Sequence, residues 1–166
     1  MKIFITGVSG TGKTSIVREL KRQGENALDI DDYCHWETKD THIVVDWEAA
    51  ASDEWYKNHE WICDIETLRA QLSTSKNIIV AGHSHNLKEY LDSFDKVFVL
   101  TCSDKTITQR IAARTDKDFG QHPADGARIL EWNKSLPAYM QKLGAEALDA
   151  ECPTEVTVGL LRSYFD

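Results

Sequence analysis

Residues 7–14 of the chain, Gly-Val-Ser-Gly-Thr-Gly-Lys-Thr, decide the fold. They match the phosphate-loop pattern G-x-x-x-x-G-K-[ST] at every fixed position, after an apolar run at Lys2–Thr6 and before a helical pattern at Thr14–Gln23. Glycines in such a loop let successive backbone N–H groups face one concavity, and the following helix adds its positive end. The predicted phosphate contacts are Gly7, Ser9, Gly10, Thr11, Gly12, Lys13 and Thr14.

The rest of the chain alternates short apolar runs with longer amphipathic stretches. Strands are expected at Lys2–Thr6, Ala27–Ile30, Asn77–Ala81, Lys96–Thr101 and Ala145–Asp149. Helices are expected at Thr14–Gln23, Glu60–Ser73, Leu87–Ser93, Asp104–Arg114, Ala124–Leu143 and Thr154–Phe165. Pro137 should kink or break its helix. This alternation predicts an α/β protein, a three-layer α/β/α fold with a five-stranded parallel sheet and ligands at the carboxyl ends of its strands.

Length, charge and hydropathy exclude several classes of protein. The 166 residues suit one domain, and a net charge of -8 disfavours partners such as nucleic acid or an anionic membrane. Apolar runs such as Asn77–Ala81 are far too short to span a bilayer, and the N-terminal run is too short for a signal peptide. The wide spacing of Cys34, Cys63, Cys102 and Cys152 predicts reduced, mostly buried thiols. A cytoplasmic protein is expected.

Three carboxylates, Asp29, Asp31 and Asp32, follow the second expected strand. At that edge of the sheet one could hold Mg²⁺ and another could accept a proton from an acceptor hydroxyl, with Asp31 the first choice for the base and, with Thr14, for the metal. The alternative is a solvated acidic turn. The stretch 31–59 that follows is rich in tryptophan and holds a candidate strand at Ile43–Val45 and a candidate helix at Ala49–Trp55.

Two further groups of polar residues lie at predicted functional positions. Arg110 and Arg114 share one face of a helix, where one guanidinium can stack on a base and the other can stabilise a phosphoryl group, although surface arginines would show the same spacing. His83, His85 and Asn86 follow the third strand and could hydrogen-bond a substrate, whereas a zinc site there lacks a third ligand. The polar stretch 115–123 has the composition of a mobile cover.

These residues together resemble the small P-loop kinases of the adenylate, shikimate and gluconate kinase group. The resemblance rests on the phosphate loop, on Asp-x-Asp-Asp at 29–32, on Arg110-x-x-x-Arg114 and on Leu-Asp-Ala at 148–150 with Pro153. The turn Gly82–Asn86 and the stretch Arg114–Pro123 are also similar to small bacterial ATP-binding proteins of the AAA type. Ala81 and His85 stand where nucleotide kinases carry Asp and Arg, which weakens the case for a nucleoside monophosphate.

The resemblance implies a sheet order of 2-3-1-4-5 and the cofactors ATP and Mg²⁺. It implies that Lys13 reaches the β- and γ-phosphates, that Thr14 binds Mg²⁺, that Arg110 stacks on adenine, and that Arg114 contacts the phosphates. The backbone after Asp149, with Pro153, would line the adenine pocket. Lys13, Asp31 and Arg114 are the expected catalytic residues.

The same architecture places the acceptor at the segment after the second strand, and the charge of that segment suggests its class. Between Glu25 and Glu66 there are 13 acidic residues and only two basic ones. A small acceptor bearing a hydroxyl, neutral or cationic and stacked on Trp36 or another of the clustered tryptophans, fits this charge, and a solvated acidic face around core tryptophans is the alternative. The expected acceptor contacts are Asp29, Asp32, Trp36, Arg69, His83, His85 and Asn86.

The sequence therefore predicts an ATP-dependent phosphotransferase. Residues 1–166 form one domain with an acceptor-binding insert at about 31–60 and a short lid at about 115–123. The protein is expected to act as a monomer or homodimer on a small molecule. A nucleoside monophosphate kinase is one alternative, and a nucleotide-binding switch or NTPase without a small acceptor is another.

Overall fold

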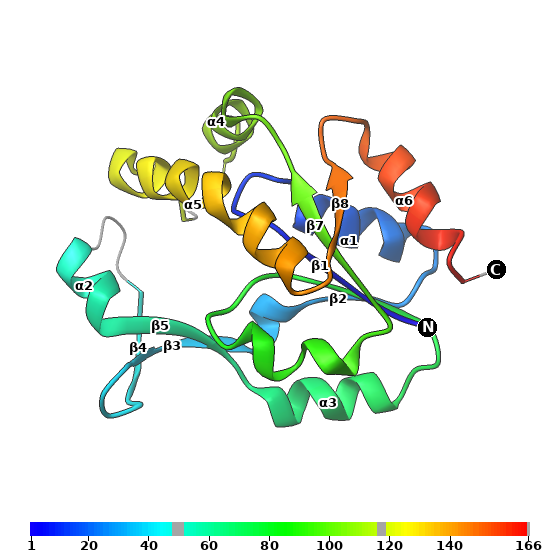
Figure 1. The fold of residues 1–166 in the computed structure, drawn as a ribbon, viewed down its shortest axis with the longest axis horizontal. Coiled ribbons are helices and arrows are strands. Elements are labelled where there is room, and N and C mark those ends of the chain that lie inside the picture. The colour runs from blue at the N-terminus through cyan, green and yellow to red at the C-terminus, as the bar shows by residue number, and fades with distance from the viewer. Residues whose placement is uncertain (48–51, 116–118, 166) are drawn as a thin grey trace.

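A computed structural model describes residues 1–47, 52–115 and 119–165 of the chain (Figure 1). Its central layer is a five-stranded parallel sheet in the order β2-β6-β1-β7-β8. The strands are β1 (Lys2–Thr6), β2 (Ala27–Asp29), β6 (Ile78–Ala81), β7 (Lys96–Thr101) and β8 (Glu146–Asp149). Numbered among themselves along the chain, they run 2-3-1-4-5, so the predicted sheet and its order are confirmed.

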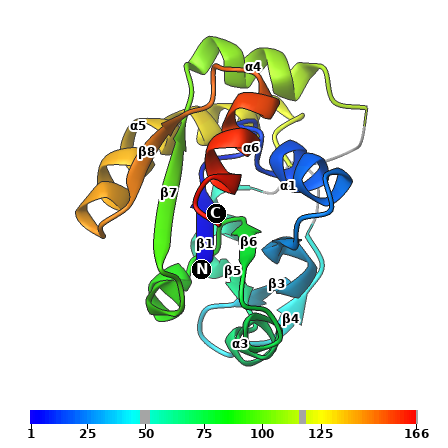
Figure 2. The ribbon, with the colours of Figure 1, turned by 90° about the vertical axis from the view of Figure 1, so that its right-hand side faces the viewer.

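Helices cover both faces of the parallel sheet (Figures 1 and 2). Alternate side chains of β1 point to opposite faces, because successive residues of a strand do so. Ile3 and Ile5 pack with α1 (Lys13–Arg22) and α6 (Thr154–Arg162), whereas Phe4 packs with α3 (Ile65–Ser73) and with Met140. A third cluster, beside the phosphate loop, joins α4 (Asp104–Ala112) and α5 (Pro123–Lys142). The predicted three-layer fold is confirmed.

A second sheet lies beside the first and was not predicted. It is antiparallel, in the order β4-β3-β5, and consists of β3 (Cys34–Thr38), β4 (Val44–Val45) and β5 (His59–Cys63). We call it the inserted sheet. A 3-10 turn at Ile30–Tyr33 leads into it, and α2 (Asp53–Asn58) precedes β5. In both views it lies with α3 at one end of the molecule, opposite α4 (Figures 1 and 2).

Several predicted elements need correction. The expected helix Glu60–Ser73 is wrong over its first residues, because His59–Cys63 pairs with β3 and the Asp64 side chain caps α3 by accepting from Thr67 N. Leu87–Ser93 forms two short 3-10 turns, Leu87–Glu89 and Leu91–Ser93. The helix through Pro137 does not break there. The candidate strand at Ile43–Val45 is present as β4, while Ala49–Ala51 lie outside the described residues.

The helices of the described part of the chain are all either too short or too polar to cross a membrane.

Candidate functional site

The N-terminus of α1 is built to receive an anion. Gly12, with φ 101°, precedes the helix and offers no side-chain cap, and the first turn carries no acidic residue. In contrast, α2, α3, α4 and α5 each have an N-cap side chain that accepts a bond from the first turn. The first N–H groups of a helix have no partner within it, so an uncapped start leaves donors and a partial positive charge for a ligand.

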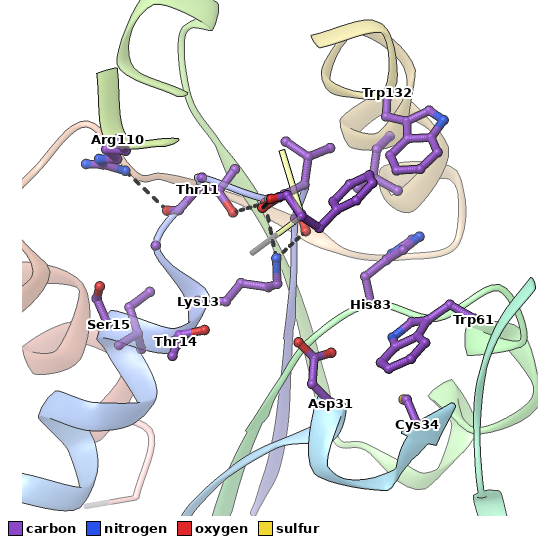
Figure 3. A pocket seen from close by; sticks show the side chains of 18 of the residues that line it. Thr11, Lys13, Thr14, Ser15, Asp31, Cys34, Trp61, His83, Arg110 and Trp132 are labelled. Carbon is purple, nitrogen blue, oxygen red and sulfur yellow. Dashed lines mark hydrogen bonds between the residues drawn. The ribbon is translucent and has the colours of Figure 1, made fainter. Parts of the chain in front are cut away.

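Lys13 and Arg110 hold the phosphate loop in shape (Figure 3). The ammonium group of Lys13 donates to the carbonyl oxygens of Gly7 at 2.7 Å and Val8 at 3.1 Å. Thr11 Oγ1 also donates to Val8 O at 2.8 Å. Arg110 donates to Thr11 O at 3.3 Å and, from its other terminal nitrogen, to Ala150 O at 2.8 Å. Arg110 thereby joins the loop to the segment after β8, on the side where the resemblance implies adenine.

A cavity of about 1190 Å³ opens in front of the loop. Its walls come from the loop and α1, from the ends of β6 and β8, from the inserted sheet and from α5. Among the predicted residues, those that line it are the whole loop from Gly7 to Thr14, Asp31, Trp36, His83, His85, Arg110 and Arg114. The carboxyl ends of the parallel strands therefore meet the cavity, as expected for this architecture.

The three aspartates separate into different places. The Asp31 carboxylate reaches into the cavity from the opposite wall to Lys13 (Figure 3). Asp29 accepts a hydrogen bond from Thr14 Oγ1 at 3.1 Å and one from Asp31 N at 3.3 Å. Asp32 is exposed and does not line the cavity. Thr14 and Asp29 thus bring a hydroxyl and a carboxylate together beside the loop, the oxygen donors that Mg²⁺ prefers.

His83 and His85 follow the end of β6, and the pKa of each ring is lowered, which favours the neutral form. Removal of its ring from solvent, with smaller contributions from Lys13 and His85, lowers the pKa of His83 to about 3. Its Nδ1 lies 3.2 Å from Thr6 Oγ1. Burial also lowers the pKa of His85, whose Nδ1 accepts from Trp61 N at 2.9 Å. Two uncharged imidazoles at the cavity can donate or accept hydrogen bonds without adding charge.

Besides Asp29 and Asp32, four predicted contacts lie away from the cavity. The Asn86 amide accepts from Cys63 N and donates to Cys63 O, both at 3.0 Å, and so holds the edge of β5. Arg69 donates to Glu89 O and pairs with Asp92. Asp149 accepts from Glu151 N at 2.8 Å, and Pro153 is the N-cap of α6. Near Asp149 and Pro153, the residues that line the cavity are Ala150, Cys152, Thr154 and Thr157.

An aromatic cluster stands on the inserted sheet. The Trp36 ring lies 4.9 Å from Trp55, 5.7 Å from Tyr56 and 5.5 Å from Trp61, between centroids. Trp36 and Trp61 line the cavity, together with Trp47. The rings are half-buried, so they form a wall of the cavity and are not the interior of a core.

The inserted sheet is joined to α5 by a set of contacts that we call the clasp. The Tyr56 hydroxyl accepts from Trp47 Nε1 at 2.9 Å and donates at 3.2 Å to the Asp125 carboxylate, which is 1% exposed. Arg128 pairs with Asp125 and with Asp53, and its guanidinium lies 3.9 Å above the Tyr56 ring. Of the clasp residues only Trp47 lines the cavity, so the clasp holds the insert against α5 from outside the cavity.

The start and end of the predicted lid are described, whereas residues 116–118 lie outside the described part of the chain. Arg114 lines the cavity and donates to Phe119 O at 3.3 Å. The Phe119 ring is stacked at 5.9 Å on Trp132 of α5 and contacts Trp47 of the insert at 6.1 Å. The segment after α4 therefore touches both α5 and the insert at the rim of the cavity.

Two cysteines that are far apart in the sequence, Cys34 and Cys63, are neighbours in the structure. Cys34 and Cys63 are partners across β3 and β5, and the interaction between their thiols raises the pKa of Cys34 and lowers that of Cys63. All four cysteines are free, as predicted, but only Cys63 is buried.

Sequence reasoning missed cavity residues that come from outside the motifs. Among them are Arg18, Cys34, His35, Trp132 and Tyr139. Arg18 stands one turn after Thr14 on α1, a signal that helical spacing could have supplied. No local pattern could have found the other residues, because the tertiary structure decides which elements border the cavity.

Comparisons with known proteins agree with this architecture. The family model described as AAA domain matches residues 3–131. Proteins named putative adenylate kinase from two strains of Halobacterium salinarum are 28% identical over 120 residues, which cover 70% of this chain and 60% of each relative. The chain thus spans about 60% of the length of these curated relatives.

Solved structures are similar over nearly the whole chain. Shikimate kinase from Acinetobacter baumannii in complex with shikimate is 16% identical with a TM-score of 0.57, covering 99% of this chain and 90% of that one. Deoxyadenosine kinase from M. mycoides with bound dATP is 16% identical with a TM-score of 0.57, covering 99% of both chains. Shikimate kinase from Bacteroides thetaiotaomicron reaches 0.59 at 16% identity, covering 99% of this chain and 98% of that one. At these identities the similarity shows a shared fold.

Proposed function

Because the chain belongs to the AAA domain family and has the fold of the small P-loop kinases, we propose that it is an ATP-dependent phosphotransferase acting on a small acceptor that bears a hydroxyl group. One observation carries the acceptor side of this proposal. The cavity wall contributed by the insert contains two carboxylates, Asp31 and Asp46, and no described lysine or arginine. That wall repels anions, so a neutral or cationic acceptor fits it.

The phosphate loop fits the cofactor ATP with Mg²⁺. The uncapped start of α1, the glycines of the loop and the Lys13 ammonium supply donors for phosphate oxygens. Thr14 would hold Mg²⁺, with the Asp29 carboxylate beside it. Bound ATP would supply the transferable γ-phosphoryl group and the metal would neutralise its developing charge. Arg110 would stack on the base while keeping its bonds to Thr11 O and Ala150 O.

Asp31 acts as the base in this proposal. Its carboxylate takes the proton of the acceptor hydroxyl as that oxygen forms a bond to phosphorus and the bond from phosphorus to the oxygen bridging to the β-phosphate breaks. Lys13 and Arg114, both on the cavity wall, stabilise the charge that develops on the transferring group. Residues 31–60 serve as the acceptor-binding insert and 115–123 as the lid, whose Phe119 meets Trp132 at the rim.

The aromatic rings give the acceptor a surface to pack on. Trp36 and Trp61 present their faces at the insert wall, and His85 offers a neutral imidazole between the insert and β6. A ring or a cationic group bound there would gain stacking or cation–π contact close to Asp31. A nucleoside, a sugar or an amino alcohol has the required hydroxyl and lacks the negative charge that this wall would oppose.

A pair of neighbouring aspartates allows a sharp test. Hydroxyl compounds are screened for ATP-dependent phosphorylation, and the best acceptor is then tested with Asp31→Asn and with the matched control Asp32→Asn. Asp31→Asn should keep ATP binding but reduce transfer by about 10²–10⁴-fold, because it removes the general base. Asp32→Asn should behave as wild type, since Asp32 is exposed and lies off the cavity. Transfer that survives in Asp31→Asn contradicts the assignment.

A nucleoside monophosphate kinase is the second candidate, favoured by the 28% identity to proteins named putative adenylate kinase and by Arg18 and Arg114 on the cavity wall. The same screen separates the two candidates. Phosphorylation of nucleoside monophosphates alone would overturn the neutral or cationic acceptor, and ATP hydrolysis that no acceptor stimulates would favour a nucleotide-binding switch or NTPase.

A further inference from the structure

One face of the inserted sheet carries imidazole and carboxylate groups that the proposed phosphotransfer does not use. Glu37 is buried, with its side chain 11% exposed, and each of its oxygens meets a histidine: Oε1 lies 2.6 Å from His42 Nδ1 and Oε2 lies 3.1 Å from His35 Nε2. Glu60 stands directly opposite Glu37 in the pairing of β3 with β5. Apart from His35, these residues do not line the nucleotide cavity.

Three of these side chains converge as metal ligands do. One carboxylate oxygen each from Glu37 and Glu60 and one nitrogen of His42 lie within 4.8 Å of one another. Ligands held at about 2.0–2.1 Å from a tetrahedral ion lie about 3.3 Å apart, so small side-chain rotations would bring all three onto one centre. Three protein ligands would leave one position for water.

The backbone and the charges of the insert favour a cation at this place. Like charges directly opposite in a sheet are destabilising, and Glu37 and Glu60 are such a pair on one face. His42 has φ 53°, in the left-handed region that residues other than glycine rarely adopt. In this conformation its ring meets the Glu37 carboxylate. A rare backbone conformation of this kind costs free energy, and it persists only where the surrounding contacts hold the residue in place.

We propose that Glu37, His42 and Glu60 form a zinc-binding site in the insert. An imidazole nitrogen beside carboxylate oxygens suits Zn²⁺ better than Mg²⁺ or Ca²⁺, which take oxygen ligands. His35, bonded to the second oxygen of Glu37, orients that carboxylate as an outer partner. The ion would tie the turn at 39–43 to β3 and β5, next to Val44 and Val45 of the cavity wall.

The test measures zinc binding to the full chain without nucleotide, by equilibrium dialysis and by the shift in melting temperature with added Zn²⁺. One ion per chain is expected. His42→Ala and Glu60→Gln should each weaken binding by at least tenfold, and His35→Ala by about 10–100-fold. Asp40→Asn, an exposed carboxylate of the same turn, is the matched control and should bind as wild type.

Four results would overturn the site. Wild-type chain that binds no zinc, or binding that persists in both His42→Ala and Glu60→Gln, contradicts it. Loss of binding in a Cys34→Ser/Cys63→Ser variant would assign the ion to the paired thiols instead. Co²⁺ gives a measurement that needs no variant: a visible absorption band that Zn²⁺ removes supports a four-coordinate site, and its absence in wild type contradicts one.

Discussion

The parallel sheet and the inserted sheet bury their side chains in different ways. In β1, β6 and the centre of β7 nearly every residue is buried, and the side chains are mostly Ile, Val, Leu and Phe. In the inserted sheet only Glu37 and Cys63 are buried, and the contacts are between half-buried aromatic rings and between imidazole and carboxylate groups. The first sheet is held by continuous aliphatic burial, the second by individual contacts to its neighbours.

The difference corresponds to two tasks. We call the parallel sheet and the helices that cover it the frame. The frame holds the phosphate loop in one geometry, since β1 leads directly into the loop and Arg110 ties the loop to the segment after β8. Ile30, at the start of the turn that leads into the insert, lies against Gly82 of the frame, and the insert meets α5 at the clasp. Substitutions in the frame should therefore affect nucleotide chemistry or global folding, and those in the insert should act locally.

The largest effect is expected at the phosphate loop, where Lys13 serves the proposed chemistry and also donates to Gly7 O and Val8 O. Lys13→Ala removes the ammonium group that the proposed mechanism places at the phosphates, and ATP turnover should fall by about 10²–10³-fold or more. Lys21→Ala, an exposed lysine later in the same helix, is the control. Steady-state turnover and thermal unfolding together check this, and equal turnover in the two variants would remove Lys13 from the mechanism.

The stability of the chain should depend strongly on the close packing of Gly82, after β6, against the Ile30 side chain. A Cβ at Gly82, where φ is 152°, would lie 2.1 Å from Ile30 Cγ1, whereas one at Gly24, where φ is 83°, would meet no atom within 4 Å. Gly24→Ala should cost about 1–2 kcal/mol of unfolding free energy from the backbone alone. Gly82→Ala should cost about 2–5 kcal/mol, because overpacking adds to it. Urea unfolding measures the loss of unfolding free energy in both variants. Equal losses would show that the Ile30 side chain moves aside to make room for the added methyl group.

Loss of a clasp contact should loosen the insert and leave the frame intact. Tyr56→Phe removes the hydroxyl that donates to buried Asp125 and accepts from Trp47, at a cost of about 1–2 kcal/mol. Hydrogen exchange should speed up in α2 and β5 and stay unchanged in β1 and β6. Tyr139→Phe, at an exposed position on α5, is the control. Faster exchange throughout both sheets would mean that the two regions unfold as one.

The smallest effect is a pH dependence that belongs to the frame. The pKa of His83 is about 3 in the folded chain, near Lys13 and His85, and about 6.5 when unfolded. The unfolded state therefore binds more protons between these values, so His83 makes stability fall as the pH drops below about 6.5. His83→Gln should remove this contribution, on the order of 1.3 kcal/mol between pH 7 and pH 5.5. Urea midpoints at pH 7 and 5.5 check it, and an unchanged slope would contradict it.

Prediction from the sequence succeeded where a pattern is local. The parallel strands stand within one residue of their predicted bounds at each end, because strands buried on both faces appear as continuous apolar runs. It failed at Glu60–Ser73, where the helical pattern of α3 was extended backward over β5. That strand exists because β3 and the Asn86 amide supply its backbone partners, and both lie more than twenty residues away.

The candidate site divides in the same way. Lys13, Asp31, Arg110 and Arg114 line the cavity, while their roles stay predictions. Asn86 had the right place in the chain, yet its amide holds the backbone of Cys63.

By itself the sequence determined the phosphate loop, the strand order and the acidic character of the insert, because each depends on residues that are neighbours in the chain or on a resemblance carried by them. Only the tertiary structure decided which side chains face one another: Trp36 with Trp61, Cys34 with Cys63, Tyr56 with Asp125, and Glu37 with His42 and Glu60. The reason is physical. Such contacts depend on the register between strands and on how the insert docks against α5, and both follow from burial and hydrogen bonding summed over the whole fold.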